Sequence, residues 1–389
     1  MDFEGLRQDI PTLNNMIYLN SGWSGPSPRK VISAITERLT YENEEGPTSR
    51  PILDSRTQIK SDARAAFARL MGATADEIVL TDNTTDGINI VLNGLRWTAG
   101  DQILTTSLEH GSGLVPSYYI ARRHGVEVEV VELSAADSPA SVISKFESSF
   151  TSGTKLLVVS HVMFRNGLML PLKELQGLAH SRGAKVLVDG AQSMGHIPLD
   201  MGEMDCDYYA VPGHKWLLGP DGVGALYIRK ELIPGVETTK IAGGAALSYD
   251  TSGNMEPNEE TVRKFELTTS SAPLLAGAAT TLGLFEELGP ENIWQRIKAL
   301  SSQLTESLSR IHGVALTSPT GGELASGLIS FAMEGREPRE LTTELWEKHR
   351  IVARSVDKPA GVRFSVHCFN TEEEMERTAQ AVGELTRSE

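Results

Sequence analysis

The chain has 389 residues, of which 40% are hydrophobic, and a formal charge of −15. This size and apolar share are enough for two or three packed units and exclude a mainly disordered chain, while the acidic balance argues against nucleic acid as a partner. The two cysteines, Cys206 and Cys368, are too few for a disulfide framework, and no stretch reads as a signal peptide or a membrane span, so we expect a cytoplasmic protein with no membrane partner.

Short apolar runs rich in β-branched residues alternate with longer amphipathic stretches through the first half of the chain. The runs expected to form strands are Glu77–Leu80, Asp101–Thr105, Val126–Val131, Lys155–Ser160 and Lys185–Val188. Their alternation with helical patterns predicts repeated strand–helix units. Because the runs are apolar throughout, we expect an α/β fold with a mostly parallel sheet and helices on both faces.

The pattern changes in the second half of the chain. The segment Ala245–Glu260, rich in Gly, Ser, Asn and acidic residues, predicts a mobile surface loop or a plain linker. Beyond Gly289 and Pro290 we expect a helix over Glu291–Ile311, a strand over Gly327–Met333, and helices over Pro338–His349 and Glu372–Leu385. These segments predict a smaller C-terminal α+β domain.

Two residues stand out as carriers of chemistry. Asp189 ends an apolar strand, at the edge where open α/β sheets bind ligands, and Lys215 lies beside an aromatic residue and a glycine-rich turn. Such a lysine could form a Schiff base if burial lowered its pKa, and such an acid could keep a ring nitrogen protonated; together these demands describe pyridoxal phosphate. Spacing alone leaves an alternative open, in which Asp189 caps a helix and Lys215 is solvated.

Seven segments in a fixed order extend this pattern over nearly the whole chain. They are Tyr18–Gly22, Thr81–Asn89, Glu109–His110, Ser160–Val162, Val188–Gln192, Gly213–Lys215 and Arg363–Thr371. Taken together they resemble the class V aminotransferase family, which contains cysteine desulfurases, isopenicillin-N-epimerase-like proteins and cysteine or cystine C–S lyases. The resemblance implies a fold-type I enzyme that uses pyridoxal phosphate, with an N-terminal arm at 1–19, a large cofactor domain at 20–290 and a small domain at 291–389. It also implies a homodimer with active sites at the subunit interface, and we expect no metal site.

The same resemblance implies roles for individual residues. Lys215 would form the Schiff base, Asp189 would pair with the pyridine nitrogen, and His110 would stack on the cofactor ring. The other residues expected to bind the cofactor are Thr84, Thr85, Asn166, Gln192, His214 and, from the neighbouring subunit, Thr269. Gln192 would reach the phenolic oxygen, and the threonines and His214 the phosphate. The structural alternatives are a core histidine at position 110 and a simple helix cap at Thr84 and Thr85.

One position departs from the family pattern. Pro212 stands where relatives usually carry Ser or Thr, two residues before the His-Lys pair. One phosphate contact is therefore absent or comes from another group, such as Ser271.

The substrate side of the site has its own candidates. Arg363 matches the arginine that clamps a substrate α-carboxylate, which implies an α-amino-acid substrate; a structural ion pair is the alternative. Further candidates for substrate contacts, each also explicable by packing, are Trp23, Arg50, Phe164, Arg165 and Trp216.

The reaction depends on which substrate bond is broken. The desulfurases need a nucleophilic cysteine on the loop before the Arg363 strand, and residues 353–361 contain none. β-Elimination needs no cysteine, so we expect a C–S β-lyase that converts an S-substituted cysteine, such as a bulky conjugate in secondary metabolism, to a thiol, pyruvate and ammonia.

Other functions stay open. They are decarboxylation-coupled oxidative deamination, transamination, epimerisation, cysteine desulfuration, and a non-catalytic binding scaffold. The scaffold is disfavoured because the chain keeps His110, Asp189, Lys215 and Arg363 together.

Overall fold

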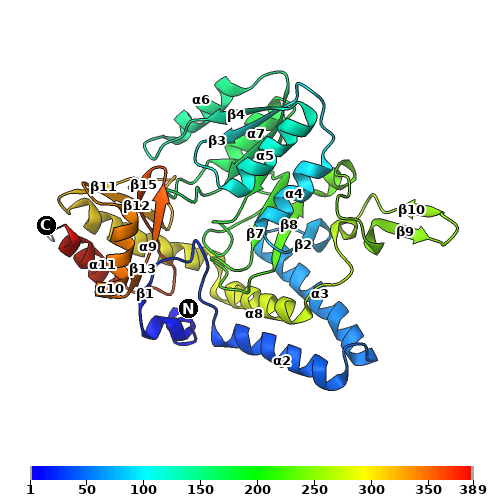
Figure 1. Cartoon of the computed structure of the whole chain (residues 1–389), viewed down its shortest axis with the longest axis horizontal. Helices are drawn as coiled ribbons and strands as arrows, with labels where there is room; N and C mark the ends of the chain where they lie inside the picture. The colour runs from blue at the N-terminus through cyan, green and yellow to red at the C-terminus, as the bar shows by residue number, and fades with distance from the viewer. Residues whose placement is uncertain (1, 387–389) are drawn as a thin grey trace.

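A seven-stranded sheet forms the centre of the computed structural model, which describes residues 2–386 (Figure 1). Its strands are β2 (Ile78–Thr81), β3 (Gln102–Thr106), β4 (Glu127–Val131), β5 (Thr154–Ser160), β6 (Lys185–Asp189), β7 (Tyr208–Pro212) and β8 (Gly224–Ile228). The order is β2-β8-β7-β6-β5-β3-β4; β8 runs antiparallel to both neighbours, and the other pairs are parallel. The five predicted strands are confirmed to within one residue at each end, and β7 and β8 come in addition.

Alternate residues of the central strands pack into two apolar cores, one on each face of the sheet. Val186 and Val188 of β6 belong to one core and Leu187 to the other. Successive side chains of a strand point to opposite faces, so both faces are covered, as predicted. The edge strand β4 is different, because its Glu127 and Glu129 are exposed. The expectation of runs that are apolar throughout is wrong for this segment, since an edge strand is not enclosed by neighbours.

Helices lie on both sides of this sheet (Figure 1). Those that connect or flank the strands are α4 (Thr84–Gly94), α5 (Gly111–His124), α6 (Pro139–Ser149) and α7 (Leu172–Ser181). A second group comprises α2 (Arg29–Glu45), α3 (Arg50–Leu70) and α8 (Ala272–Leu288), in which α8 packs against the other two. The predicted α/β class is confirmed.

A smaller sheet and three helices form the C-terminal part. The sheet is antiparallel in the order β11 (Val314–Leu316), β12 (Leu328–Met333), β15 (Ala360–Ser365) and β14 (Arg354–Asp357). The helices are α9 (Pro290–Ser309), α10 (Pro338–His349) and α11 (Glu372–Leu385), close to the predicted bounds. The N-terminal arm contains α1 (Phe3–Gln8) and β1 (Ile17–Tyr18), and β1 pairs with β13 (Ile351–Val352). The proposed domain boundaries after residues 19 and 290 stay predictions.

The segment predicted as a loop or linker forms a hairpin that projects from the body (Figure 1). Strands β9 (Ala246–Tyr249) and β10 (Met255–Pro257) pair antiparallel. The backbone N–H groups of Ser252 and Asn254 donate to Asp250, and Gly253 takes a positive φ of 92°, so the turn is built from local polar contacts. The surface position was predicted correctly, whereas the expected lack of regular structure was wrong.

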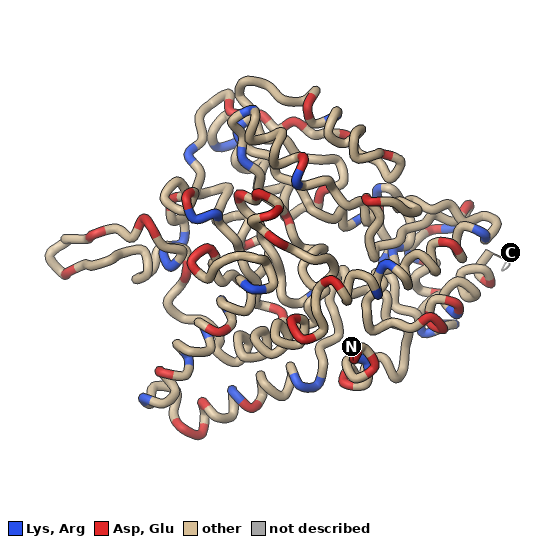
Figure 2. Tube along the Cα trace, turned by 180° about the vertical axis from the view of Figure 1, so that it is seen from behind, with Lys and Arg blue, Asp and Glu red and all other residues tan. Residues whose placement is uncertain are grey.

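Charged residues are spread over the whole trace. Figure 2 shows Lys and Arg interspersed with Asp and Glu in both the large and the small part. Within residues 2–386, no helix is both long and apolar enough to span a membrane.

Candidate active site

Six of the nine predicted cofactor residues line one cavity of about 890 Å³. Asp189 reaches it from the end of β6, Lys215 from the loop after β7, and Thr84 from the first turn of α4. Its lining also contains Trp23, Thr85, His110 and His214 among the predicted residues, and Asp82, Asn83, Asp86, Asn89, Ser112, Ala191, Lys240 and Arg354 besides. The sheet edge named from the sequence is therefore the edge that carries the cavity.

Lys215 and Asp189 form the electrostatic centre of this cavity. Burial lowers the pKa of the Lys215 amine to about 8, against the opposing effect of Asp189, while Arg363 and Arg354 lower it further. Burial raises the pKa of Asp189, and Lys215 and the Ala191 N–H, which donates to Oδ1 at 2.9 Å, act in the opposite direction. The alternative of a solvated lysine is wrong, since Lys215 is only partly exposed and lines the cavity. A lysine with this pKa is partly neutral near pH 7.5 and can act as a nucleophile or a base.

His110 contributes an accessible ring to the cavity rather than a core side chain. It is the N-cap of α5, and the Ser112 N–H donates to Nδ1 at 3.1 Å, so the ring proton of the neutral form is on Nε2. The ring meets Phe164 edge-on with centroids 4.9 Å apart. Burial and Lys215 lower its pKa, which favours the neutral ring. A neutral ring beside Lys215 fits stacking on a cofactor.

The N-terminus of α4 has the composition of an anion site. Asn83 is the N-cap, with its side chain accepting from the Asp86 N–H, so the alternative that Thr84 or Thr85 serves as the cap is wrong. The Thr84 hydroxyl is buried and has no hydrogen-bond partner among the described residues, although it lines the cavity. The Thr85 hydroxyl donates to Ser112 Oγ at 2.9 Å. An unpartnered hydroxyl at a helix N-terminus suits a phosphate oxygen.

Arg363 is buried on β15 and is not among the residues that line the cavity. It donates to the backbone oxygen of Phe164 at 2.6 Å and to Asn20 Oδ1 at 3.4 Å, and its Nε has no partner in the part of the chain that the structure describes. Burial lowers its pKa to about 9, with Arg354 as the second cause. The alternative of a structural ion pair is wrong, because no described carboxylate pairs with it. A buried guanidinium without an anion is prepared for one from a ligand.

Some predicted residues have contacts within the protein instead. Gln192 donates to the backbone oxygen of Gly22 at 2.8 Å and accepts from Trp216 Nε1 at 2.9 Å, so both ends of its amide are engaged. Trp216 is buried and stacked on His196 with centroids 3.8 Å apart. Asn166 is buried and accepts from the Leu168 N–H at 3.2 Å. None of these three residues lines the cavity, and their predicted roles toward the cofactor or the substrate stay predictions.

Two more predicted residues lie outside the cavity of the single chain. Arg50 is exposed at the start of α3 and pairs with Asp54 at 2.9 Å. Thr269 is exposed and lines a neighbouring hollow of about 340 Å³ together with Ser271, whose hydroxyl caps α8. The role of Thr269 concerns a second subunit and stays a prediction.

Three residues near the site were not identified from the sequence. Arg354, on β14, lies 4.4 Å from the centre of the Trp23 ring, and Lys240 pairs with Asp86 at the start of α4. Glu109 is buried beneath the site and accepts from the Ser160 N–H and hydroxyl and the Thr106 hydroxyl. Burial raises the pKa of Glu109 to about 7. Glu109 could have been found from the sequence, because it directly precedes His110 in one of the seven family-like segments. Lys240 and Arg354 lie in none of these segments, so no sequence signal pointed to them.

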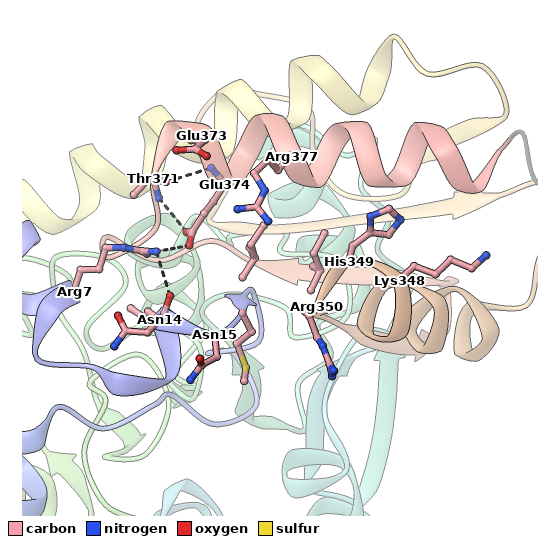
Figure 3. Close-up of a pocket in the computed structure, with 14 residues that line it drawn as sticks. Arg7, Asn14, Asn15, Lys348, His349, Arg350, Thr371, Glu373, Glu374 and Arg377 are labelled. Carbon is pink, nitrogen blue, oxygen red and sulfur yellow. Dashed lines mark hydrogen bonds and ion pairs between the residues drawn. The ribbon is translucent and has the colours of Figure 1, made fainter.

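A second pocket, of about 540 Å³, lies between the N-terminal arm and helices α10 and α11 (Figure 3). Figure 3 shows Arg7 and Glu374 pointing toward each other, and they pair at 2.7 Å. Its lining shares no residue with the cavity at Lys215 and contains none of the predicted site residues. The cavity at Lys215 is therefore the candidate active site.

Both cysteines are buried away from this cavity. Cys206 accepts from Gln176 Nε2 at 3.2 Å, and Cys368 lies 3.3 Å from His367 Nδ1. Burial raises the pKa of each thiol. Neither is prepared to act as a thiolate.

Comparisons with known proteins agree with this geometry. The family model described as aminotransferase class V matches residues 17–378. A probable cysteine desulfurase of Methanothermobacter thermautotrophicus is 30% identical over 401 residues, covering 99% of this chain and 98% of that protein. An isopenicillin N epimerase of Streptomyces clavuligerus is 31% identical over 399 residues, with the same coverage.

Solved structures give the same assignment. The cystine C–S lyase C-DES, in complex with its reaction product cysteine persulfide, superposes with a TM-score of 0.90 at 31% identity, covering 96% of this chain and 99% of that one. A C-DES variant with glycine covalently linked to its PLP cofactor gives a TM-score of 0.91 at 31% identity, covering 97% and 98%.

Proposed function

Because this chain belongs to the class V aminotransferase family and uses pyridoxal phosphate, we propose that it is a C–S β-lyase acting on an S-substituted cysteine. The residues present fit this cofactor: an enclosed lysine, a buried carboxylate at a strand end, and an unpartnered hydroxyl at a helix N-terminus share one cavity. When bound, the cofactor supplies an electron sink for charge that develops at the substrate's α-carbon.

Asp189, Lys215 and Arg363 each have a separate role in this reaction. Asp189 holds a proton on the ring nitrogen, and its burial makes that pairing strong. Lys215 carries the cofactor and then accepts the proton from the α-carbon, for which a pKa of about 8 is well placed. Arg363 holds the α-carboxylate, since its guanidinium has no acidic partner within residues 2–386.

The overall reaction consumes the S-substituted cysteine and one water molecule and needs no other reactant. The S-substituted cysteine loses its α-proton, the bond between the β-carbon and sulfur breaks, and the thiolate leaves with a proton as the thiol. Water then releases the remaining three-carbon unit as pyruvate and ammonium. Arg354 and Trp23 border the same cavity and are placed to contact the sulfur substituent.

The observation that carries the choice of reaction is the position of the two thiols. A desulfurase transfers sulfur to a cysteine thiolate, whereas Cys206 and Cys368 are both buried outside the cavity and their pKa values are raised. Elimination is compatible with that arrangement. An epimerase is the second candidate, favoured by the 31% identical isopenicillin N epimerase. We also propose that the enzyme is a homodimer in which Thr269 of one subunit serves the site of the other.

The test follows the products formed from S-alkyl cysteines by the purified holoenzyme. We expect equal amounts of thiol, pyruvate and ammonia, and a Cys206→Ala/Cys368→Ala variant that keeps the activity. Free cysteine is assayed in parallel, and alanine formed from it, but lost in the double variant, would establish a desulfurase instead. A change of configuration without thiol release would establish an epimerase.

A further inference from the structure

At the end of the cavity near Thr84, where we expect the cofactor phosphate, two carboxylates lie close to the helix N-terminus. Asp82 directly precedes the N-cap of α4 and Asp86 lies in its first turn, and both line the cavity. A phosphate dianion at this helix N-terminus would meet two carboxylates as well as the favourable helix dipole. Burial and Lys215 lower the pKa of His214, so its ring supplies no full positive charge at pH 7.

Lys240 is the cation that lies at this end. It lines the cavity at Lys215, and it also lines the neighbouring hollow, which shares Asp82 and Asp86 with the cavity. Its amine pairs with Asp86 Oδ1, and Asp86 Oδ2 is held by the Asp82 N–H at 3.2 Å. The side chain is 38% exposed, and an ammonium group has three N–H donors, so the amine can donate to a further acceptor besides Asp86.

An independent feature points to an anion at the same place. The Thr84 residue is 6% exposed, and its hydroxyl lines the cavity with no hydrogen-bond partner among residues 2–386. A buried, unsatisfied hydroxyl is costly unless a ligand completes it. Lys240 and Thr84 therefore approach the same region from different segments.

The chain also has no hydroxyl at position 212, where the resemblance to the family predicts a phosphate contact. Pro212 ends β7 and has no hydroxyl, and Ser271, the substitute suggested by the sequence, does not line the cavity and caps α8 instead. We propose that Lys240 binds the cofactor phosphate and takes the place of the hydroxyl absent at position 212. Asp86 then orients the amine and shares its charge with the phosphate.

Phosphate binding by Lys240 and a purely structural Lys240–Asp86 ion pair predict different effects on cofactor affinity when the Asp86 charge is removed. If Lys240 and Asp86 only stabilise each other, removing either charge has the same effect. If Lys240 binds phosphate, removing its charge weakens cofactor binding, while removing the Asp86 charge leaves binding equal or stronger, because a repulsive carboxylate is lost and the lysine is released.

The experiment measures the dissociation constant of pyridoxal phosphate by equilibrium dialysis of the holoenzyme, together with the ³¹P NMR shift of the bound cofactor. Lys240→Gln is expected to raise the dissociation constant about ten-fold and to move the ³¹P signal. Lys240→Arg, which keeps the charge, should stay close to wild type. Asp86→Asn should bind equally or more tightly.

A gain-of-contact variant completes the test. Adding Pro212→Ser to Lys240→Gln should restore part of the lost affinity by returning the hydroxyl. The proposal is overturned if Lys240→Gln leaves both the dissociation constant and the ³¹P shift unchanged. It is also overturned if Asp86→Asn weakens binding as much as Lys240→Gln does.

Discussion

The lowered pKa of Lys215 makes a quantitative prediction about how the cofactor-free enzyme captures pyridoxal phosphate. Only the neutral amine attacks the cofactor aldehyde. With a pKa of about 8, roughly a quarter of the lysine is neutral at pH 7.5, whereas an unperturbed lysine at 10.5 would be about 0.1% neutral. The burial of Lys215 therefore increases the reactive fraction about 200-fold at that pH.

The assay is stopped-flow absorbance of covalent cofactor capture between pH 6 and 10. The rate is divided by the rate that Nα-acetyl-lysine, measured in parallel, shows per neutral amine, which removes the titration of the cofactor itself and leaves that of Lys215. The wild-type rate should rise about ten-fold per pH unit below pH 7 and level off above about pH 8. Lys215→Ala, which has no amine at this position, should show no capture.

The Asp189→Asn variant tests the direction in which Asp189 shifts the pKa of Lys215. Asp189 raises the pKa of Lys215 against the effect of burial, so removing its charge should move the plateau to a lower pH. A wild-type rate that still climbs ten-fold per unit beyond pH 9 would refute the reasoning, as would an Asp189→Asn plateau shifted to higher pH.

Three further predictions follow from individual contacts. Arg363→Lys should raise the KM for the amino acid about 100-fold and leave the absorbance of the bound cofactor unchanged, because one amine cannot replace a bidentate guanidinium; an unchanged KM would remove Arg363 from the substrate site. Asp189→Asn should keep the cofactor and lower kcat at least about 100-fold in steady-state assays; turnover close to wild type would show that no ring-nitrogen proton is needed. Burial raises the pKa of Glu109 from 4.5 to about 7, so its favourable protonated form is fully present below pH 4.5 and is lost as the pH rises through 7. Urea unfolding of wild type and Glu109→Gln should therefore show the variant gaining about 3 kcal/mol relative to wild type between pH 4.5 and 8, and a pH-independent difference would contradict this burial effect.

The parts of the fold that the sequence predicted best are those with local signals. β6 reads as an apolar run that ends in an acid. α10 and α11 begin and end at the predicted residues because each has an amphipathic period, with Pro338 at the start of α10 and a capping box of Thr371 and Glu374 on α11. The hairpin at 246–257 could not be predicted in this way, because its strands are exposed and its turn depends on Asp250 side-chain contacts.

The same division holds in the candidate site. Asp189 was predictable because it ends an apolar strand, and the strand ends of a parallel sheet converge on one edge. Lys215 was identified by the aromatic residue and the glycine-rich turn beside it, since strand β7 before it was not predicted. Lys240 and Arg354 reach the cavity from a long connection and from the small sheet, so only the tertiary fold brings them there. The contacts of Gln192 with Gly22 and Trp216 depend on segments distant in the chain for the same reason.

The pattern of ion pairing gives an independent argument that the cavity is completed by anions. Two arginines elsewhere have carboxylate partners within the chain: the buried Arg38 pairs with Glu42 at 2.9 Å, and the partly buried Arg64 pairs with Glu266 at 2.6 Å. Arg363 is as deeply buried, yet within the described residues it contacts only neutral oxygens. Burying a guanidinium without an anion costs several kcal/mol, which evolution tolerates where a ligand restores the balance. The α-carboxylate of an amino acid is a ligand that would do so, which supports the proposed amino-acid substrate whichever of its bonds is broken.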